Sequence, residues 1–387
     1  QKSIYFVRQQ VSSECLARAN QPRGIYTLTV PTGGGKTFSS FRYALHHAKK
    51  HGLERIFYIV PFTSIIDQNV EEIKKIYPPE LQELILEHHS NLEPEEDTWQ
   101  SGIWKQNWDS PIIFTTMVQF LNALFSNGTS GARKMHQLSN SLIIFDEIQA
   151  LPIKCVHLFC NTINFLIEIS SASVLLCTAT QPSFGELENP DKGYLHLAQD
   201  HELVKDTTDL FQKLERVEIS NQTKAGGWTA QEIGQFARDL YKKHQNCLVV
   251  VNTRKHANTL FRLCKDVDGV FHLSTHQCPA HRKALLKTIR QRLDDGLPVL
   301  CISTQLIEAG IDISFNAVIR VLAGLDSIAQ AAGRCNRHGS LSKGYVYIVN
   351  TLAECLDKLE DIKAGQKQCT RVINENSIQS LLTPPVI

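Results

Sequence analysis

Several classes of protein are excluded by what the 387-residue chain lacks. It contains no run of about 20 apolar residues, the length that a membrane-spanning helix needs. Its first residues, QKSIYFVRQQ, have no apolar core followed by a small-residue cleavage site, so we predict no signal peptide. An initiator methionine is also missing, and we expect the chain to begin inside a longer protein.

Paired cysteines and a strong charge imbalance are missing as well. The 11 cysteines include no Cys-x-x-Cys pair, and such an odd, scattered set is typical of reduced thiols in a cytoplasm. It argues against a disulfide framework or a zinc ribbon. The net charge is only +1, so a global positive field cannot hold nucleic acid. Phosphates would have to be bound by local amides, hydroxyls and cations.

Short apolar runs alternate with helical patterns along the chain. Runs this continuously apolar predict strands buried on both faces, so we expect parallel sheets covered by helices. Apolar residues at three- and four-residue steps predict the buried face of an early helix: Phe38, Phe41, Ala44, Leu45 and Ala48. The predicted strands span residues 24–30, 55–60, 111–116, 141–146 and 173–180, then 216–220, 247–253, 299–304, 317–322 and 344–349.

A polar, turn-rich stretch separates the two α/β halves. We therefore predict two doubly wound α/β domains in tandem, covering residues 1–205 and 206–350, and this chain length suits two domains. Residues 351–387 show no clear strand pattern, and we interpret them as the start of a truncated accessory region.

The stretch YTLTVPTGGGKT leads from a predicted strand into a predicted helix through three glycines. Glycine lets the backbone wrap closely around phosphate oxygens, and the positive end of the helix dipole points at the same place. The lysine would reach the β- and γ-phosphates of ATP, and the threonine hydroxyl would bind Mg²⁺. Val30 stands where the usual loop has its first glycine. The candidate ATP-binding residues are Thr32, Gly33, Gly34, Gly35, Lys36 and Thr37.

Two acids stand at the tip of another predicted strand, in LIIFDEIQAL. Asp146 would hold Mg²⁺ through water, and Glu147 would orient and deprotonate the attacking water. With the glycine-rich loop, this pair predicts hydrolysis of ATP, with Mg²⁺ as cofactor.

In the second half, QAAGRCNRHG supplies Arg334 and Arg337, which could reach the γ-phosphate of ATP held by the first domain. Such arginine fingers accelerate related NTPases by roughly 10³–10⁵-fold.

These motifs resemble those of the superfamily 2 DExD/H-box helicases, which have two tandem RecA-like P-loop domains with parallel sheets flanked by helices. PFTSII, TTMVQF, TAT, VVNTR and STQLIEAGIDI also match, so the resemblance spans nearly the whole chain. The segments DEIQ, TVPTGGGKT, EHHSN, HLSTHQCPAHR and QAAGRCNRHG are most similar to the helicase portion of the CRISPR-associated type I helicase–nuclease.

The resemblance implies an ATP-driven translocase and helicase that moves 3′ to 5′ on single-stranded DNA. It would be recruited by a Cascade-type guide-RNA surveillance complex. Members of that family carry an N-terminal His-Asp (HD) nuclease domain. This chain has no His-Asp dipeptide, so we expect the nuclease upstream of Gln1 or on a separate chain.

Roles implied by the family extend the candidate site. Gln149 and the run from Thr178 to Thr180 would couple hydrolysis to strand binding. Gly310, Asp312 and Gln330 would contribute to ATP binding, with Asp312 near the ribose. Nucleic-acid phosphates would be held by residues at strand ends and helix starts. These are Thr63, Ser64, Thr116, Asn252, Arg254, Thr275, Ser303 and Thr304.

Other interpretations stay open. The motor motifs contact phosphates and scarcely distinguish sugars, so a DExD/H-box RNA helicase is one alternative. A nucleotide-gated scaffold that binds nucleic acid without turnover is another, although a water activator and two arginine fingers favour hydrolysis. A zinc site is a third candidate, although a nucleic-acid loop is expected in that segment. Its possible ligands are His272, His276, Cys278 and His281.

Overall fold

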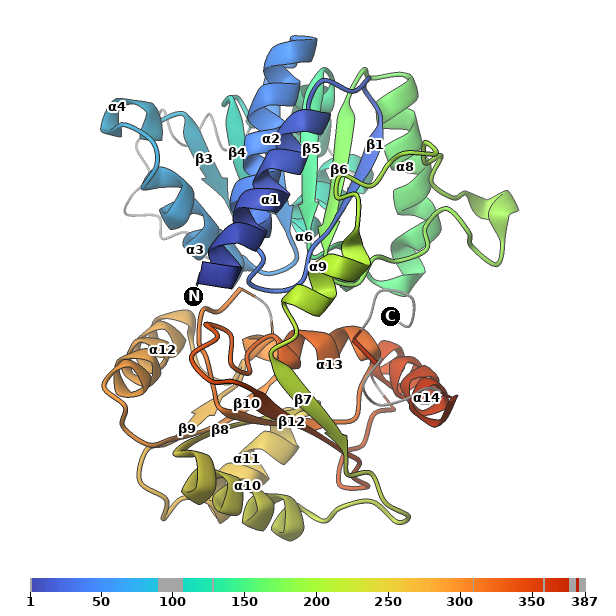
Figure 1. Ribbon diagram of the computed structural model, residues 1–387. Coiled ribbons are helices and arrows are strands. Elements are labelled where there is room, and N and C mark those ends of the chain that lie inside the picture. Colours follow the sequence, from blue (N-terminus) through green and yellow to red (C-terminus); the bar gives the residue numbers. More distant parts are fainter. Residues whose placement is uncertain are drawn as a thin grey trace. The chain divides into compact units, whose positions relative to one another are not determined.

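The computed structural model describes residues 2–89, 107–126, 129–308, 310–357, 359–375 and 381–382. They form two compact units, residues 2–213 and residues 214–387, each built on a parallel sheet covered by helices (Figure 1). The first unit ends at residue 213 rather than at the predicted residue 205. The reason is that helix α9 (Thr207–Lys213) contacts helix α1 (Lys2–Arg18) of the first unit.

The sheet of the first unit has six parallel strands in the order β1-β6-β5-β2-β4-β3. Its strands are β1 (Ile25–Thr29), β2 (Arg55–Val60), β3 (Ile85–His88), β4 (Ile112–Thr116), β5 (Ser141–Asp146) and β6 (Ser173–Thr178). All five strands predicted for this half are therefore confirmed. The structure adds β3, a four-residue strand at the edge of the sheet.

The sheet of the second unit also has six parallel strands, in the order β7-β12-β11-β8-β10-β9. Its strands are β7 (Val217–Asn221), β8 (Asn246–Val251), β9 (Val270–Leu273), β10 (Val299–Thr304), β11 (Ala317–Val321) and β12 (Gly344–Val349). The five predicted strands are again present, and the structure again adds an edge strand, β9. The predicted class, α/β with two tandem parallel sheets, is confirmed.

Helices cover both faces of the first sheet (Figure 1). α6 (Met117–Phe125) and α8 (Val156–Glu168) pack on one face, while α2 (Lys36–His51) and α3 (Thr63–Lys74) lie on the other. Two short helices, α4 (Pro79–Gln82) and α7 (Thr129–Met135), complete the described set in this unit together with α1 and α9.

The predicted buried face of α2 is partly wrong. Phe41, Ala44 and Ala48 are buried, but Phe38 is 44% exposed and Leu45 is 38% exposed. The buried arc instead includes Tyr43 and His47. It is displaced because α2 packs between the sheet and α1, so a second neighbour covers positions that a simple sheet-facing stripe would leave in water.

In the second unit, α10 (Ala230–His244) and α11 (Arg254–Leu263) cover one face of the sheet. α12 (Pro279–Asp294) and α13 (Leu325–Ala332) cover the other. The tail that was expected to begin an accessory region contributes α14 (Glu360–Glu375) to this unit, because Cys369 and Ile373 pack against Ile328 and Ile348.

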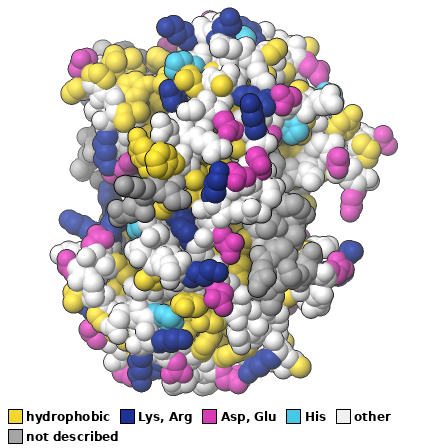
Figure 2. Space-filling view, in the orientation of Figure 1, with side chains coloured by type: hydrophobic (Ala, Val, Ile, Leu, Met, Phe, Trp, Pro, Cys, Tyr) yellow, Lys and Arg dark blue, Asp and Glu magenta, His cyan; other side chains and the backbone are white. Residues whose placement is uncertain are grey.

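The surface and the thiols agree with the composition. On the face shown in Figure 2, lysine and arginine side chains are interspersed with aspartate and glutamate rather than gathered into one basic surface. All eleven cysteines are unpaired thiols, which confirms that disulfides do not hold the fold together. Within the described ranges, no helix combines the length and apolar character needed to cross a membrane.

Candidate active site

The loop between β1 and α2 forms a tight turn of bare backbone. Gly33 and Gly35 have φ values of 83° and 89°, in the left-handed region that favours glycine. The N–H of Gly34 donates to the carbonyl of Pro31 at 3.0 Å, and Arg8 of α1 donates to the carbonyl of Gly33 at 2.9 Å. A Cβ on Gly35 would lie only 3.1 Å from Arg8 Cγ, so a side chain there would crowd the loop.

Lys36, the first residue of α2, meets the two predicted catalytic acids. Its Nζ lies 2.6 Å from Glu147 Oε1 and 3.2 Å from Asp146 Oδ1. Burial alone would lower the pKa of Lys36, but the two adjacent carboxylates outweigh burial and raise it. The ammonium is therefore held in its charged form beside both acids, and three residues chosen from sequence converge at one point.

Asp146 lies at the carboxyl end of β5 and is buried. Burial raises the pKa of its carboxyl group, with Lys36 opposing that rise and Glu147 adding to it. The Tyr58 hydroxyl donates to Asp146 Oδ2 at 3.3 Å and lies 3.5 Å from the hydroxyl of Ser40 on α2. Tyr58 thus links the carboxylate at the end of β5 with the first turns of α2.

The Thr37 hydroxyl and the Asp146 carboxylate fit Mg²⁺. The ion prefers oxygen ligands and usually takes only one or two from protein, the rest coming from water and substrate phosphates. Thr37, in the first turn of α2, supplies a hydroxyl, and Asp146, at the carboxyl end of β5, supplies a carboxylate. Among the described residues, no group of three His, Cys, Asp or Glu side chains could hold a metal ion.

Glu147 has a φ of 53°, an unusual left-handed conformation for a residue other than glycine. Strained backbone of this kind is found often at functional sites. Gln149 donates to Glu147 Oε2 at 2.7 Å, and the hydroxyl of Thr178 donates to Gln149 Oε1. The Thr178 hydroxyl also accepts from the N–H of Thr180 at 2.9 Å. The residues predicted to couple hydrolysis to strand binding therefore form one continuous chain of contacts with the acid.

The two predicted arginine fingers have different surroundings inside the second unit. Arg337 Nε lies 2.7 Å from Oδ1 of Asp312, the carboxylate predicted to approach the ribose. Burial would raise the pKa of Asp312, but Arg337 outweighs it and lowers that pKa. Arg334 is buried, and it donates to the carbonyls of Ile307 and Glu308 at 3.0 and 2.6 Å.

Gln330 and Gly310 lie on different parts of the second unit. Gln330 is half-buried on α13. Gly310 has a φ of 69°, a value that requires glycine-like freedom in the segment after β10.

The residues predicted to hold nucleic acid fall into two groups. Several have structural contacts: Thr116 caps α6 by accepting from the N–H of Gln119, and the buried Ser303 donates to the carbonyl of Thr304. Thr304 is buried as well, and all side-chain polar atoms of Asn252 bond within the unit. The others lie at accessible or half-buried positions: Arg254 and Thr275 are exposed, and Thr63 is half-buried. The side chain of Ser64 lies outside what the structure describes.

The zinc interpretation is wrong. His272, His276, Cys278 and His281 all lie in described segments, and no metal-binding group forms there. The ring of His272 stacks on Phe261, with ring centroids 5.5 Å apart. Gln277 folds back over the same segment and donates to the carbonyl of His272 at 2.8 Å. His272 therefore packs against Phe261, and the described residues of this segment form no metal site.

Sequence reasoning missed three polar residues close to these sites. Tyr58 stands inside the apolar run RIFYIV and gave no signal other than its hydroxyl. Arg320, buried in β11, lies 2.7 Å from the carboxylate of Glu308. Burial raises the pKa of Glu308 to about 7, although Arg320 opposes the rise. A charged residue in a buried strand was the available signal for Arg320.

Family models match two stretches of the chain. Residues 2–183 match the type III restriction enzyme, res subunit. Residues 243–340 match the C-terminal part of the CRISPR-associated nuclease/helicase Cas3. The CRISPR-associated nuclease/helicase Cas3 of Haloferax volcanii is 26% identical over 454 residues, covering 88% of this chain and 48% of that protein. The chain spans less than half the length of the curated Cas3 relatives that it matches.

Solved structures share the architecture. The crystal structure of T. fusca Cas3 with ADP matches with a TM-score of 0.71 at 16% identity, over 97% of this chain and 52% of that chain. A chain of a CRISPR RNA-guided surveillance complex, in a pre-nicking state, matches with a TM-score of 0.65 at 16% identity, over 96% of this chain and 49% of that chain. At these identities the likeness concerns the fold, two tandem RecA-like domains.

Proposed function

Because the chain belongs to the superfamily 2 helicases and is related to the helicase portion of the CRISPR-associated nuclease/helicases, we propose that it is an ATP-driven translocase moving 3′ to 5′ on single-stranded DNA in type I CRISPR interference. Both matched families support an ATP-dependent enzyme. The direction of movement and the choice of DNA are parts of the proposal that rest on the family resemblance.

The observation that carries the proposal is the cluster of Lys36, Asp146 and Glu147. The ammonium and the two carboxylates come from the glycine-rich loop and from the tip of β5, and Lys36 Nζ lies within 3.2 Å of both acids. A purely structural ion pair would not need the left-handed glycines of the adjacent loop. The combination of a phosphate cradle, one cation and two acids is what hydrolysis of a nucleoside triphosphate requires.

The contacts suggest how the site responds to ATP. A phosphate entering the cradle offers Lys36 a new anionic partner, so Lys36 can leave Glu147. Glu147, no longer neutralised, can then accept a proton from the attacking water. Mg²⁺, held by Thr37 and Asp146, would neutralise phosphate charge. Gln149 hydrogen-bonds both Glu147 and Thr178. A movement of β6, which carries Thr178, would therefore shift the general base.

The arginines of the second unit would supply positive charge to the γ-phosphate in the transition state. Arg337 would have to exchange Asp312 for phosphate, which resembles the exchange proposed for Lys36. We propose that both exchanges occur in the same step, so that hydrolysis requires both units. Nucleic-acid phosphates would be held by the accessible predicted residues, such as Arg254 and Thr275.

We also propose partners for the whole protein. A Cascade-type surveillance complex would deliver the chain to its DNA, and an HD nuclease domain, upstream or on a separate chain, would cut that DNA. Support comes from two similar proteins: the Haloferax relative is a nuclease/helicase, and one structural neighbour is a chain of a CRISPR RNA-guided surveillance complex.

The proposal is tested by measuring ATP hydrolysis with and without single-stranded DNA or RNA, with Lys36→Ala as the control. We expect single-stranded DNA to stimulate the wild type and neither polymer to stimulate the variant. Stimulation by RNA alone would support the RNA-helicase alternative. Binding of ATP and DNA without turnover would support the scaffold alternative.

A further inference from the structure

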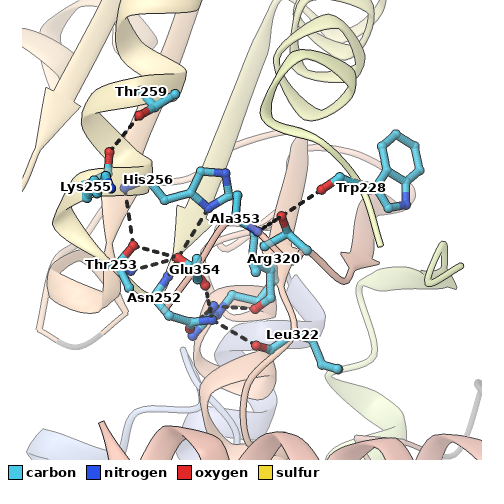
Figure 3. Close-up of polar contacts among 12 residues, drawn as sticks. Trp228, Asn252, Thr253, Lys255, His256, Thr259, Arg320, Leu322, Ala353 and Glu354 are labelled. Atoms are coloured by element: carbon cyan, nitrogen blue, oxygen red, sulfur yellow. Dashed lines mark hydrogen bonds and ion pairs between the residues drawn. The ribbon is translucent and has the colours of Figure 1, made fainter. Parts of the chain in front are cut away.

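A carboxylate lies buried at the N-terminal end of α11 (Figure 3). Glu354, from the segment after β12, has a side chain only 1% exposed. Its Oε1 accepts from the N–H groups of Asn252 and Thr253 at 2.7 and 2.8 Å and from the Thr253 hydroxyl at 3.3 Å. Asn252 Nδ2 donates to Oε2 at 2.8 Å, and His256 Nδ1 lies 3.3 Å from Oε1. An internal anion therefore fills the helix end where a nucleic-acid phosphate was predicted.

Asn252 is fully used inside the unit. Besides its bond to Glu354, its Nδ2 donates to the carbonyl of Leu322 at 3.0 Å, and its Oδ1 accepts from Arg320 at 2.8 Å. A phosphate could reach this position only by displacing a buried carboxylate that accepts hydrogen bonds from four donor groups. Leaving buried donors without an acceptor would lower the stability of the folded state. Asn252 is therefore better placed to connect Glu354 with Arg320 than to contact nucleic acid.

The connection continues to the arginine of the predicted finger motif. Arg320 Nε lies 2.7 Å from Glu308 Oε1, directly after the turn η6 (Gln305–Ile307). Arg334 donates to the carbonyls of Ile307 and Glu308 on that turn. A polar chain thus runs from Glu354 through Asn252 and Arg320 to the backbone that holds Arg334. The charged residues of this chain alternate in sign, and their side chains are buried. Solvent therefore screens their interactions only weakly, and a change of charge at Glu354 would affect the residues near Arg334.

We propose that Glu354 is a positioning residue for the motor. It fixes Asn252 and Arg320, and through them the turn on which the Arg334 guanidinium lies. This inference rests on the proposed function, because it requires that Arg334 act in ATP hydrolysis. It assigns a role to residues 351–355, which follow the last strand and contain none of the helicase motifs.

The test compares two substitutions in the same segment of the full chain. In Glu354→Gln, the new NH₂ group must face Asn252 Nδ2 or the two backbone N–H groups, so a donor meets donors and the chain is broken. Asp357→Asn is the matched control, because Asp357 is 78% exposed, and its carboxylate contacts Lys363 at 3.5 Å and the exposed Cys355 thiol at 3.3 Å but none of the buried polar residues that the structure describes. ATP hydrolysis is measured at saturating single-stranded DNA, together with nucleotide binding and the thermal unfolding midpoint.

We expect Glu354→Gln to lower kcat by about 10- to 100-fold, the cost of a modest misplacement of a catalytic group, with the KM for ATP within about twofold of wild type. Asp357→Asn should match wild type. Glu308→Gln should show a similar loss, and the double variant should lose less than the product of the two, because both act through one chain. If Glu354→Gln does not fold, Glu354→Asp, which keeps the charge but shortens the reach, should show the same kcat loss.

Equal kcat values for Glu354→Gln, Asp357→Asn and wild type would overturn the inference. So would a Glu354→Gln variant that binds single-stranded DNA more tightly with undiminished kcat, because Glu354 would then compete with phosphate rather than position Arg334. Strict multiplicativity of the two kcat losses would also overturn it. A wild type that hydrolyses no ATP would instead refute the proposed function.

Discussion

Lys36 Nζ lies 2.6 Å from Glu147 Oε1, so the lysine that follows the glycine-rich loop is paired with the acid that we propose as the general base. Burial would lower the pKa of Lys36, but the carboxylates of Asp146 and Glu147 together raise it. In the proposed mechanism, Glu147 would become available to the attacking water only after a phosphate draws Lys36 away.

The first prediction concerns Glu147→Gln. The amide keeps the shape of the side chain but cannot take a proton, so hydrolysis should fall by about 10²–10⁴-fold. Binding of ATP should persist, because the cradle and Lys36 remain. Steady-state hydrolysis and equilibrium binding of a fluorescent ATP analogue check the two parts. Lys36→Ala is the contrasting control, expected to lose both, and undiminished hydrolysis by Glu147→Gln would remove Glu147 from its role.

The second prediction concerns coupling through Thr178. Thr178→Val removes the hydroxyl that donates to Gln149 and keeps the volume of this buried side chain. We expect basal ATP hydrolysis to stay within about threefold, while stimulation by single-stranded DNA falls by about 10-fold, since the buried network loses the bond to Gln149 and the bond from the Thr180 N–H. The ratio of stimulated to basal rate is the measurement.

Thr162→Val is the matched control for that experiment. Its hydroxyl donates to the carbonyl of Leu158 within α8, away from the acids. If single-stranded DNA stimulates ATP hydrolysis by Thr178→Val as strongly as it stimulates the wild type, the Gln149–Thr178 contact carries no coupling.

The third prediction is a pH dependence of stability that arises at His47. This ring is buried, bonds to Ala19 and Ser173, and has its pKa lowered by burial from 6.5 to about 4. The unfolded chain takes up a proton near pH 6.5 and the folded chain does not, so the folded state loses stability as pH falls from 6.5 toward 4. Above pH 6.5 this contribution is fully present.

Thermal unfolding midpoints between pH 7.5 and pH 4.5 test the prediction. His47→Gln should be less stable at pH 7.5 but should show a shallower decline on acidification. The control is His46→Gln, a change at the exposed neighbouring position on the same helix. Parallel pH profiles for His47→Gln and wild type would exclude His47 as the source.

Much of this architecture could be predicted because buried central strands are long and continuously apolar. The two missed strands are both at sheet edges: β3 reads ILEH and β9 reads VFHL, with only four residues each and polar members. An edge strand has one neighbour instead of two, so its composition is less constrained. The acids and the lysine were found because a short motif fixes their chemistry.

The contacts that were missed depend on distant partners. Glu354 meets Asn252 across 102 residues, and no local pattern at either position signals the meeting. Tyr58 looks like a core residue in its strand, and only the register of the parallel sheet brings its hydroxyl to Asp146. The motif that contains Asn252 predicted a contact with nucleic acid. Its side chain instead bonds the carboxylate of Glu354, which lies outside every helicase motif.

The last prediction concerns Arg337, which the structure holds on Asp312 at 2.7 Å. If Arg337 is a finger, Arg337→Ala should reduce hydrolysis by about 10³-fold while leaving ATP binding intact, because its charge matters in the transition state. Arg290→Ala is the matched control: this exposed arginine of α12 also lowers the pKa of Asp312, so both variants remove a positive charge near the same carboxylate. Equal losses in the two variants would point to a field effect on Asp312, and a loss confined to Arg337→Ala would identify the finger. Hydrolysis rates are measured at saturating ATP, so that a change in the affinity for ATP does not affect the comparison.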